Sequence, residues 1–367
     1  MNEYVLVLIW LAFMGFLSML LPVKKTVALD YDNDHEQQRY SLIFCIIVMI
    51  PLIYWATFRY QWFGDTNQYV RTYLSTPESF TGLRAYLETV GKDKGFAIFR
   101  ILCRMVFHDD FRGFFFVIAL IQGVCVMLGF RAISPHYMFS MFLFVLGCDY
   151  FAWMYNGIRQ FLVASILFAC APLLIKKKYV PMILIIVLLY FIHGSDFIWL
   201  PFLFIAQGKP WNKKTVAFLL AIIAAVVFLE EFTDLLGGYM DNSQYAYEKK
   251  DLMQDDGTGW PRIMVYSVPA LLSFPYRKKI AEYDSPIINI SVNMSIATMG
   301  LYIISGFTSG IYIGRLPIYF SLFNYVLLPW EIKHLFAEGT RQIIIVMCFL
   351  LYAIFFYVQM HGVWGVL

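Results

Sequence analysis

Charged residues are scarce in this chain of 367 residues. Lysine, arginine, aspartate and glutamate together make up 14% of it, whereas a soluble domain averages about a quarter. This scarcity excludes an ordinary soluble enzyme. The net charge of +3 is also too small to indicate a nucleic-acid partner.

Signatures of metal and nucleotide sites are missing too. The six cysteines form no CxxC pair and keep no metal-ligand spacing with a histidine, so we interpret them as small core residues. There is no HExxH, no Walker-type glycine loop, no GxSxG and no DxD-like pair. These gaps argue against a soluble-type nucleotide-sugar enzyme on a membrane anchor, and we expect neither a metal nor a cofactor. The N-terminus lacks a basic region and a small-residue cleavage site, so we expect its first apolar segment to be retained.

Apolar sequence is abundant instead, with 60% hydrophobic residues and a mean hydropathy of +0.65. Apolar windows of roughly 20 residues recur from end to end, and they predict an all-α polytopic protein with about 12 (roughly 10–14) transmembrane helices in a single membrane domain, 1–367. The expected spans are 4–22, 41–58, 112–130, 137–154, 158–175, 179–192, 194–207, 214–230, 260–275, 285–305, 311–329 and 342–364.

Lysine and arginine in alternate short loops set the expected orientation, with both termini outside. This orientation places two long loops outside the cytoplasmic membrane. Loop 59–111 contains a short amphipathic helix at 94–108, which we interpret as interfacial or re-entrant because it is too short to span. Loop 231–259 is either a lid over a glycan groove or a solvated loop.

The stretch "FRYQWFGDTNQY" concentrates polar groups beside large aromatic side chains. An interfacial aromatic belt with a solvated turn explains the rings, but it does not explain Arg59, Asp65 and Thr66 together. Tyr69, Arg71 and Tyr73 continue the stretch at alternate positions. All of these residues fall at the expected outer ends of helices.

The stretch "NGIRQF" begins a strongly apolar helix with Asn156, Arg159 and Gln160. The planar guanidinium of Arg159 suits phosphate, and a helix N-terminus favours an anion. A snorkelling arginine with Asn156 as helix cap is the simpler alternative. In "RLPIYF", Arg315 lies inside an apolar segment without an acid, which favours a functional role over a structural one, and Tyr319 follows it.

Two further stretches carry titratable groups. "FIHGSDF" interrupts an apolar run at His193, which we interpret as a proton carrier or a donor to pyrophosphate. Backbone freed at such a break must line protein or a water-filled cavity. "KDKGF" opens the short helix, and Asp93 is there expected to be its N-cap.

Taken in order, these motifs resemble the EpsG-like family of polysaccharide polymerases, which is related to Wzy-type O-antigen polymerases. "RYQWFGDTNQY" resembles that family's R…GTD…Y signature, "DKGF" its acid-x-G-F element, "NGIRQF" its N-x-x-R-Q element, "IH" its histidine turn and "GRLPIYF" its R-x-x-x-Y-F element. The resemblance runs over roughly residues 55–325. One departure is that glycine-threonine-aspartate becomes Gly64-Asp65-Thr66.

The resemblance implies a C-type, metal-independent glycosyltransferase with its active site facing outside the bacterial cytoplasmic membrane. It would transfer a growing glycan from undecaprenyl pyrophosphate to the non-reducing end of a lipid-linked repeat unit. Other implied partners are membrane lipids, a chain-length regulator and a flippase. The expected catalytic residues are Asp65 as first choice of base, His193 as second choice, and Arg159 and Arg315 for the pyrophosphate. The expected substrate-binding residues are Arg59, Thr66, Tyr69, Tyr73, Asp93, Asn156, Gln160 and Tyr319.

Three other functions stay open at this point. An O-antigen-type ligase of related fold would use the same donor and another acceptor. A lipid-linked oligosaccharide flippase or transporter would need midplane charges and internal repeats, and we find no convincing repeat. A membrane O-acyltransferase would need a histidine within a membrane helix, for which only His193 qualifies.

Overall fold

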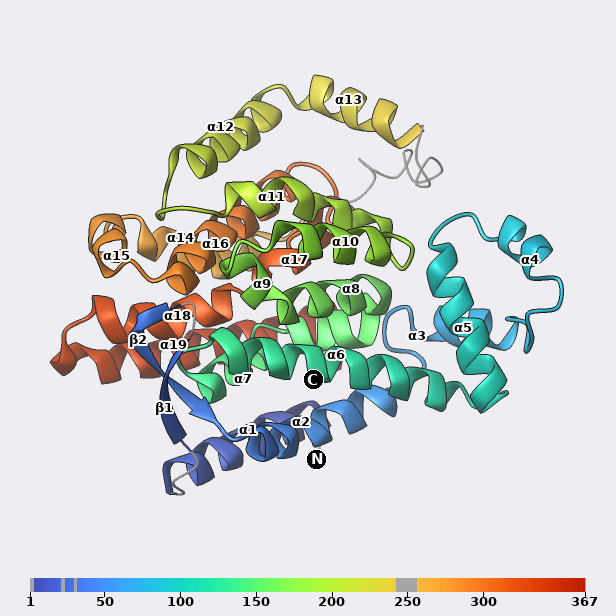
Figure 1. Cartoon of the computed structure of the whole chain (residues 1–367), viewed down its shortest axis with the longest axis horizontal. Coiled ribbons are helices and arrows are strands. Elements are labelled where there is room, and N and C mark those ends of the chain that lie inside the picture. Colours follow the sequence, from blue (N-terminus) through green and yellow to red (C-terminus); the bar gives the residue numbers. More distant parts are fainter. Residues whose placement is uncertain (1–2, 21–23, 30–31, 242–255, 367) are drawn as a thin grey trace. The chain divides into compact units, whose positions relative to one another are not determined.

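The computed structural model describes residues 3–20, 24–29, 32–241 and 256–366. Within them the chain is almost entirely helical, with one antiparallel hairpin of β1 (Lys24–Leu29) and β2 (Asp32–Tyr40) (Figure 1). No sequence pattern predicted this hairpin. The chain divides into two compact units, of which unit 1 comprises residues 1–197 and 336–367, and unit 2 comprises residues 198–335.

Among the described residues, unit 1 contains the hairpin, twelve helices that precede unit 2 in the chain and two that follow it. Its helices are α1 (Glu3–Leu20), α2 (Leu42–Thr57), α3 (Thr66–Leu74), α4 (Leu83–Thr89), α5 (Lys94–Phe107), α6 (Phe111–Ile133), α7 (Tyr137–Leu146), the π-helix η1 (Tyr150–Asn156), α8 (Ile158–Ala169), α9 (Ala171–Ile175), α10 (Tyr179–Tyr190), the 3₁₀-helix η2 (Gly194–Ile198, whose last residue falls in unit 2), α19 (Glu338–Val358) and the π-helix η5 (Gln359–Val363).

Helix α6 is the centre of unit 1, since α2 and α8 both pack along it. Small residues allow this close approach. A methyl group on Gly123 would lie 2.7 Å from the Ile53 side chain, and one on Gly129 would lie 2.4 Å from the Phe168 ring. The buried amide of Gln122 donates a 2.8 Å hydrogen bond to the Ile158 carbonyl. That bond fixes the first turn of α8 against α6.

Unit 2 surrounds α16 (Pro286–Ser305), which is almost completely buried between α14 (Trp260–Ser273), α12 (Lys213–Val227) and α18 (Asn324–Leu335). Proline at the first helical position and the Ser285 hydroxyl begin α16. The other elements of unit 2 are α11 (Trp199–Ile205), α13 (Leu229–Asp241), α15 (Arg277–Tyr283), η4 (Ile313–Arg315) and α17 (Ile318–Ser321). Residues 242–255 of the expected outer loop 231–259 lie outside the described residues.

Among the described residues, four helices are long and apolar enough to cross a membrane: α1, α6, α16 and α19 continued by η5. Two bent pairs raise this number to six if each pair is one span. The helical membrane class is therefore confirmed. The expected count of about twelve spans is not.

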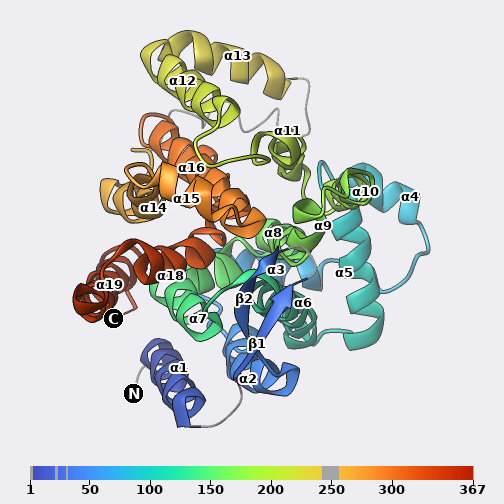
Figure 2. The ribbon, with the colours of Figure 1, turned by 60° about the vertical axis from the view of Figure 1, so that its left-hand side comes forward.

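Breaks within the predicted spans, together with apolar helices that are too short, such as α2, account for this difference. Segment 137–154 bends by 71° between α7 and η1, and segment 214–230 leads into a bend of 101° between α12 and α13 (Figure 2). Segment 158–175 divides at Cys170, just before a proline. Segment 311–329 divides into η4, α17 and α18. A hydropathy window registers composition and cannot register such breaks.

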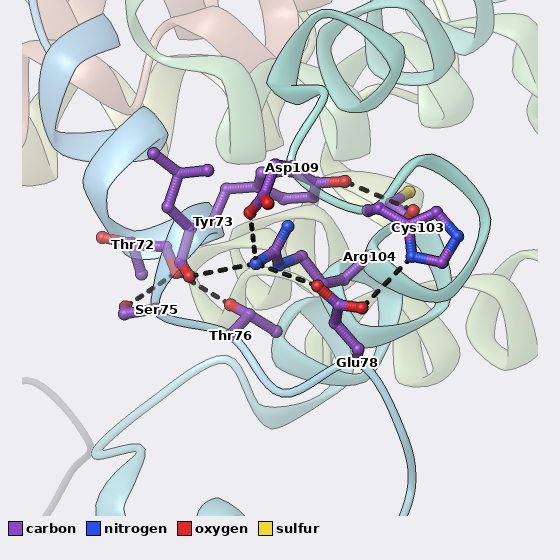
Figure 3. A network of polar contacts seen from close by, with 10 residues as sticks. Thr72, Tyr73, Ser75, Thr76, Glu78, Cys103, Arg104 and Asp109 are labelled. Atoms are coloured by element: carbon purple, nitrogen blue, oxygen red, sulfur yellow. Dashed lines mark hydrogen bonds and ion pairs between the residues drawn. The ribbon is translucent and has the colours of Figure 1, made fainter.

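Between α2 and α6 the chain forms a compact arm of α3, α4 and α5, which we call the α3–α5 arm. Arg104 of α5 ties it together, as Figure 3 shows. Its Nη2 lies 3.1 Å from Glu78 Oε1 and 2.7 Å from Asp109 Oδ1, and its guanidinium lies over the Tyr73 ring. The expected amphipathic helix at 94–108 is thus confirmed as α5, a helix of 14 residues.

A cluster of buried apolar side chains seats this arm on α6 and α8. Phe96 of α5 and Tyr73 of α3 meet Phe114 of α6 and Ile158 of α8 there. Burying a large apolar side chain stabilises a fold by about 1.5–3 kcal/mol. Because Phe96 and Ile158 are both in the cluster, the start of α5 and the start of α8 are held beside each other.

Candidate active site

Three segments of unit 1 bring their polar ends together. Asp93 directly precedes α5, Arg159 is in the first turn of α8, and His193 is in the turn between α10 and η2. These residues are far apart in the chain, with 66 positions between Asp93 and Arg159 and 100 between Asp93 and His193. Their convergence is the main polar feature of unit 1.

Asp93 is the centre of this group. Its carboxylate is buried, and its Oδ2 accepts hydrogen bonds from Arg159 Nη1 at 2.7 Å and from His193 Nδ1 at 3.2 Å. Its Oδ1 accepts from the Gly194 backbone at 3.3 Å. Asp93 has the N-cap position of α5 as expected, but the expected side-chain cap bond is absent from the described residues. The carboxylate binds across to α8 and the His193 turn instead.

The backbone of Asp93 is in the left-handed region, at φ 58° and ψ 47°. A residue other than glycine adopts this conformation rarely and at a free-energy cost, and such residues concentrate at functional sites. Here the conformation lets the chain turn into α5 while the carboxylate remains directed toward Arg159 and His193. The contacts made by that carboxylate offset the local strain.

The position two residues after Asp93 requires a glycine, Gly95, because the backbone of Phe191 approaches it closely. A methyl group at this position would lie 2.7 Å from the Phe191 carbonyl oxygen, which is closer than real Cβ atoms approach. The absence of a side chain lets the Phe96 amide donate a 3.2 Å hydrogen bond to that same carbonyl. The first turn of α5 is therefore docked on the turn that carries His193.

Burial and charge determine the ionisation of this group. Burial by itself raises the pKa of Asp93. The opposing effects are together larger, so the net shift is downward: the pKa is lowered by the hydrogen bond and charge of His193, by the charge of Arg159 and by the Gly194 amide. Burial lowers the pKa of His193 below 6.5, although the hydrogen bond and charge of Asp93 oppose this effect. We conclude that Asp93 is ionised and that His193 is neutral near pH 7.

A second contact lies next to this group and involves Asp65 and Asn156. The Asn156 side-chain oxygen accepts a 2.8 Å hydrogen bond from the Asp65 amide. Gly64 makes the approach feasible, because it has φ +51° and a methyl group there would lie 2.2 Å from that oxygen. Asn156 ends η1 and Gly157 is the N-cap of α8, so the simpler alternative in which Asn156 caps α8 is wrong. Asn156 instead connects the Asp65 turn to α8.

Three of the predicted substrate-binding residues are buried among protein groups. Arg59 donates from Nη1 to the Met154 and Tyr155 carbonyls at 2.6 and 2.9 Å. Its guanidinium lies over the Phe115 ring, and burial lowers its pKa to about 10. Thr66 donates to the Phe63 carbonyl, and Tyr73 donates to the Cys103 carbonyl. These observed contacts are structural.

Other predicted residues surround the group around Asp93. Tyr69 is half-buried on α3, and Arg159 lies 6.0 Å from its ring centroid. Gln160 is buried, and its amide lies 3.4 Å from the Ser195 hydroxyl in the His193 turn. Tyr69 and Gln160 thus border Arg159 from two sides.

Two more residues of this neighbourhood, Arg100 and Asp196, were not among the predicted site residues. Arg100 of α5 lies against the ring of Phe96, which Arg159 also contacts. Its place one helical turn after Phe96 was the available signal. Asp196 is fully buried three residues after His193, and neither of its carboxyl oxygens has a hydrogen-bond partner among the described residues. A buried carboxyl in this situation favours its uncharged form.

Arg315 and Tyr319 belong to unit 2. Arg315 ends the short helix η4 rather than lying inside a long apolar helix, and it is partly buried. Tyr319 is buried in α17. Gly314 packs tightly beneath them, since a methyl group there would lie 2.4 Å from the Thr258 hydroxyl. The expected roles of Arg315 and Tyr319 remain predictions.

Comparison with known proteins gives one clear result. No curated protein and no solved structure matches the chain. The model of the EpsG family matches residues 42–364, which is most of the chain and includes every residue of the candidate site. The chain therefore belongs to the EpsG family, a family of polysaccharide polymerases of the glycosyltransferase type.

Proposed function

We propose that this protein lengthens a polysaccharide by transferring a glycan from a polyprenyl pyrophosphate carrier to a hydroxyl group of a lipid-linked repeat unit. The carrier would be undecaprenyl pyrophosphate, and the site would face the outside of the bacterial cytoplasmic membrane. The observation that supports this proposal is the sharing of Asp93 Oδ2 by Arg159 and His193. It places a guanidinium and an imidazole on one carboxylate.

The imidazole has the properties of a general base. An ionised Asp93 accepts a hydrogen bond from the Nδ1–H group, so the neutral ring of His193 carries its basic lone pair on Nε2. A hydroxyl group of the acceptor sugar would give its proton to Nε2 as it attacks. We therefore prefer His193 to Asp65 as the base.

The guanidinium has the properties needed at the leaving group. In the proposed step, the bond between the anomeric carbon and the bridging pyrophosphate oxygen breaks, and the bond to the acceptor oxygen forms. The electron pair of the broken bond stays on the pyrophosphate. Arg159 has 29% of its side chain exposed, so part of its guanidinium is accessible to that developing charge. A fixed cation would make the reaction independent of a metal ion.

Substitution of the two side chains tests the proposal. We expect His193→Gln and Arg159→Gln to be inserted and folded but to accumulate single repeat units, with chain synthesis reduced about 10²- to 10⁴-fold for the loss of the base. His361→Gln in η5 and Arg71→Gln on α3 are the matched controls, since both side chains are exposed outside the site. Polymer of normal length from both site variants would refute the proposal, and strong inhibition by EDTA would refute its metal independence.

A further inference from the structure

Arg100 gives the site a second cation. Its guanidinium carbon lies 5.8 Å from the Phe96 ring centroid, and that of Arg159 lies 5.9 Å from the same centroid. The two side chains come from different helices, α5 and α8. They are close enough for the charge of Arg159 to act on the pKa of Arg100.

The two arginines differ in how their charges are balanced. Arg159 forms an ion pair with Asp93, whereas no carboxylate pairs with Arg100 among the described residues. The contact of Arg100 is a 3.2 Å hydrogen bond from Nη2 to the Tyr86 hydroxyl. Its Nε is buried and has no hydrogen-bond partner within the described part of the chain. A neutral phenol oxygen does not compensate a guanidinium charge.

This arrangement has a physical cost in the unliganded protein. Burial lowers the pKa of Arg100, contacts with Tyr86 oppose that effect, and the charge of Arg159 adds to it. Arginine nevertheless stays protonated at physiological pH. Arg100 has no pairing carboxylate among the described residues, so an anionic ligand would compensate its charge.

We infer that Arg100 and Arg159 together bind the pyrophosphate group of the lipid carrier, one guanidinium to each phosphate. This inference rests on the proposed function and names the second half of its donor site. Two planar guanidinium forks suit a ligand with two phosphates better than a ligand with one phosphate. Both guanidinium groups lie within 6 Å of the centroid of the Phe96 ring.

Tyr86 of α4 is the positioning residue for Arg100. Its hydroxyl accepts the Nη2 hydrogen bond and lies 3.5 Å from the Thr76 hydroxyl. Helix α4 has no fully buried residue, so this contact is one of the few that tie it to α5. Loss of the Tyr86 hydroxyl should loosen Arg100 without removing its charge.

Binding of inorganic pyrophosphate and of inorganic phosphate tests the inference. The purified full-length protein would be held in nanodiscs of zwitterionic lipid, and both ligands would be titrated by calorimetry. We expect the wild type to prefer pyrophosphate. Arg100→Gln should weaken pyrophosphate binding by about tenfold or more, as expected for hydrogen bonds to a charged group, with little change for phosphate. Tyr86→Phe should weaken it by a smaller factor.

Arg84→Gln is the matched control, because Arg84 is on α4, is 95% exposed at its side chain and pairs with Glu88. An equal loss in this variant would show general electrostatic attraction and overturn the inference. So would an unchanged affinity in Arg100→Gln, or no pyrophosphate binding by the wild type up to millimolar concentration. If Arg100→Gln does not fold, Arg100→Lys and Tyr86→Phe decide the question in the same assay.

The outcome is separable from that of the proposed function. A pyrophosphate preference that depends on Arg100, in a protein that makes no polymer, would support the binding site and refute the reaction. Polymer synthesis that depends on His193, together with pyrophosphate binding that is unchanged in Arg100→Gln, would support the reaction and refute the binding site.

Discussion

The imidazole of His193 is oriented by Asp93, with Nδ1 3.2 Å from Oδ2 of a carboxylate that is almost completely buried. This contact selects the tautomer with the proton on Nδ1 and leaves the basic lone pair on Nε2. Arg159 binds the same carboxylate oxygen at 2.7 Å, so one buried acid positions both a base and a cation. Asp93 is therefore a positioning residue in the proposed reaction.

The first prediction concerns pH. His193 must be neutral to accept a proton, and its burial lowers its pKa below 6.5. We expect the polymerisation rate to be nearly constant around pH 7 and to fall as the pH decreases through the pKa of His193. Asp93→Asn removes a group that raises this pKa, so the decline should move to lower pH. The maximal rate of this variant should also fall, because the imidazole and Arg159 lose their common acceptor.

The measurement is a rate profile between about pH 5 and 8, the range in which histidine titrates. Thermal stability must be followed alongside it, because the same pKa shifts make stability fall as the pH falls. The unfolded chain binds protons more readily than the folded chain at both His193 and Asp93, so acid favours unfolding. A rate profile that is unchanged in Asp93→Asn would contradict the orientation of the base by Asp93.

Local pattern sufficed for many of the helices and for the membrane class. The apolar runs predicted α1, α6, α16 and α19 within a few residues, because about 20 predominantly apolar residues specify a long buried or membrane helix. The pattern failed where the helix axis changes direction, as between α7 and η1. The side chains on either side of such a break are equally apolar, so hydropathy does not change there.

The site was predictable as a set of residues and not as an arrangement. Asp93, Arg159 and His193 stood out because polar groups interrupt apolar sequence. Their contacts join residues 66 and 100 positions apart, and no periodicity encodes such pairs. Arg100 was overlooked because a cation on an amphipathic helix ordinarily faces solvent. Its burial depends on Phe96 and on α8, which only the packing reveals.

The second prediction concerns the docking of α5. Gly95→Ala would place a methyl group 2.7 Å from the Phe191 carbonyl oxygen, so the first turn of α5 must shift. We expect the Phe96 amide to lose its bond to that carbonyl and Asp93 to move away from His193. Overpacking of this kind costs about 1–3 kcal/mol of stability. Polymer synthesis should fall by more than the small loss of folded protein explains.

Gly339→Ala is the control for this variant. Gly339 is in the first turn of α19, and a methyl group there would meet no atom within 4 Å. It should leave synthesis unchanged and leave thermal stability unchanged or slightly raised, since alanine favours a helix more than glycine does. Full activity in Gly95→Ala would show that the docking on Phe191 does not position the site.

The third prediction concerns the clasp formed by Arg104. Its Nη2 bridges Glu78 and Asp109, and also lies 3.4 Å from the Leu74 carbonyl (Figure 3). Arg104 is buried, whereas Glu78 and Asp109 are 45% and 83% exposed at their side chains, so solvent screens part of the attraction. We expect Arg104→Gln to destabilise the α3–α5 arm by about 1.5–2 kcal/mol, in the lower part of the range for hydrogen bonds to charged groups.

Hydrogen exchange measures this effect where it should occur. Residues 75–89, which connect α3 to the end of α4, should exchange faster in Arg104→Gln, while α6 should be unchanged because its packing on α2 and α8 does not involve the clasp. Arg84→Gln, which removes an exposed ion pair of the same arm, should not change exchange measurably.

Because α4 carries Tyr86 and thereby holds Arg100, loosening of the arm should also weaken pyrophosphate binding. Faster exchange throughout unit 1 would instead mean that Arg104 stabilises the whole unit, and unchanged exchange in residues 75–89 would mean that the apolar cluster around Phe96 and Tyr73 is sufficient to hold the arm.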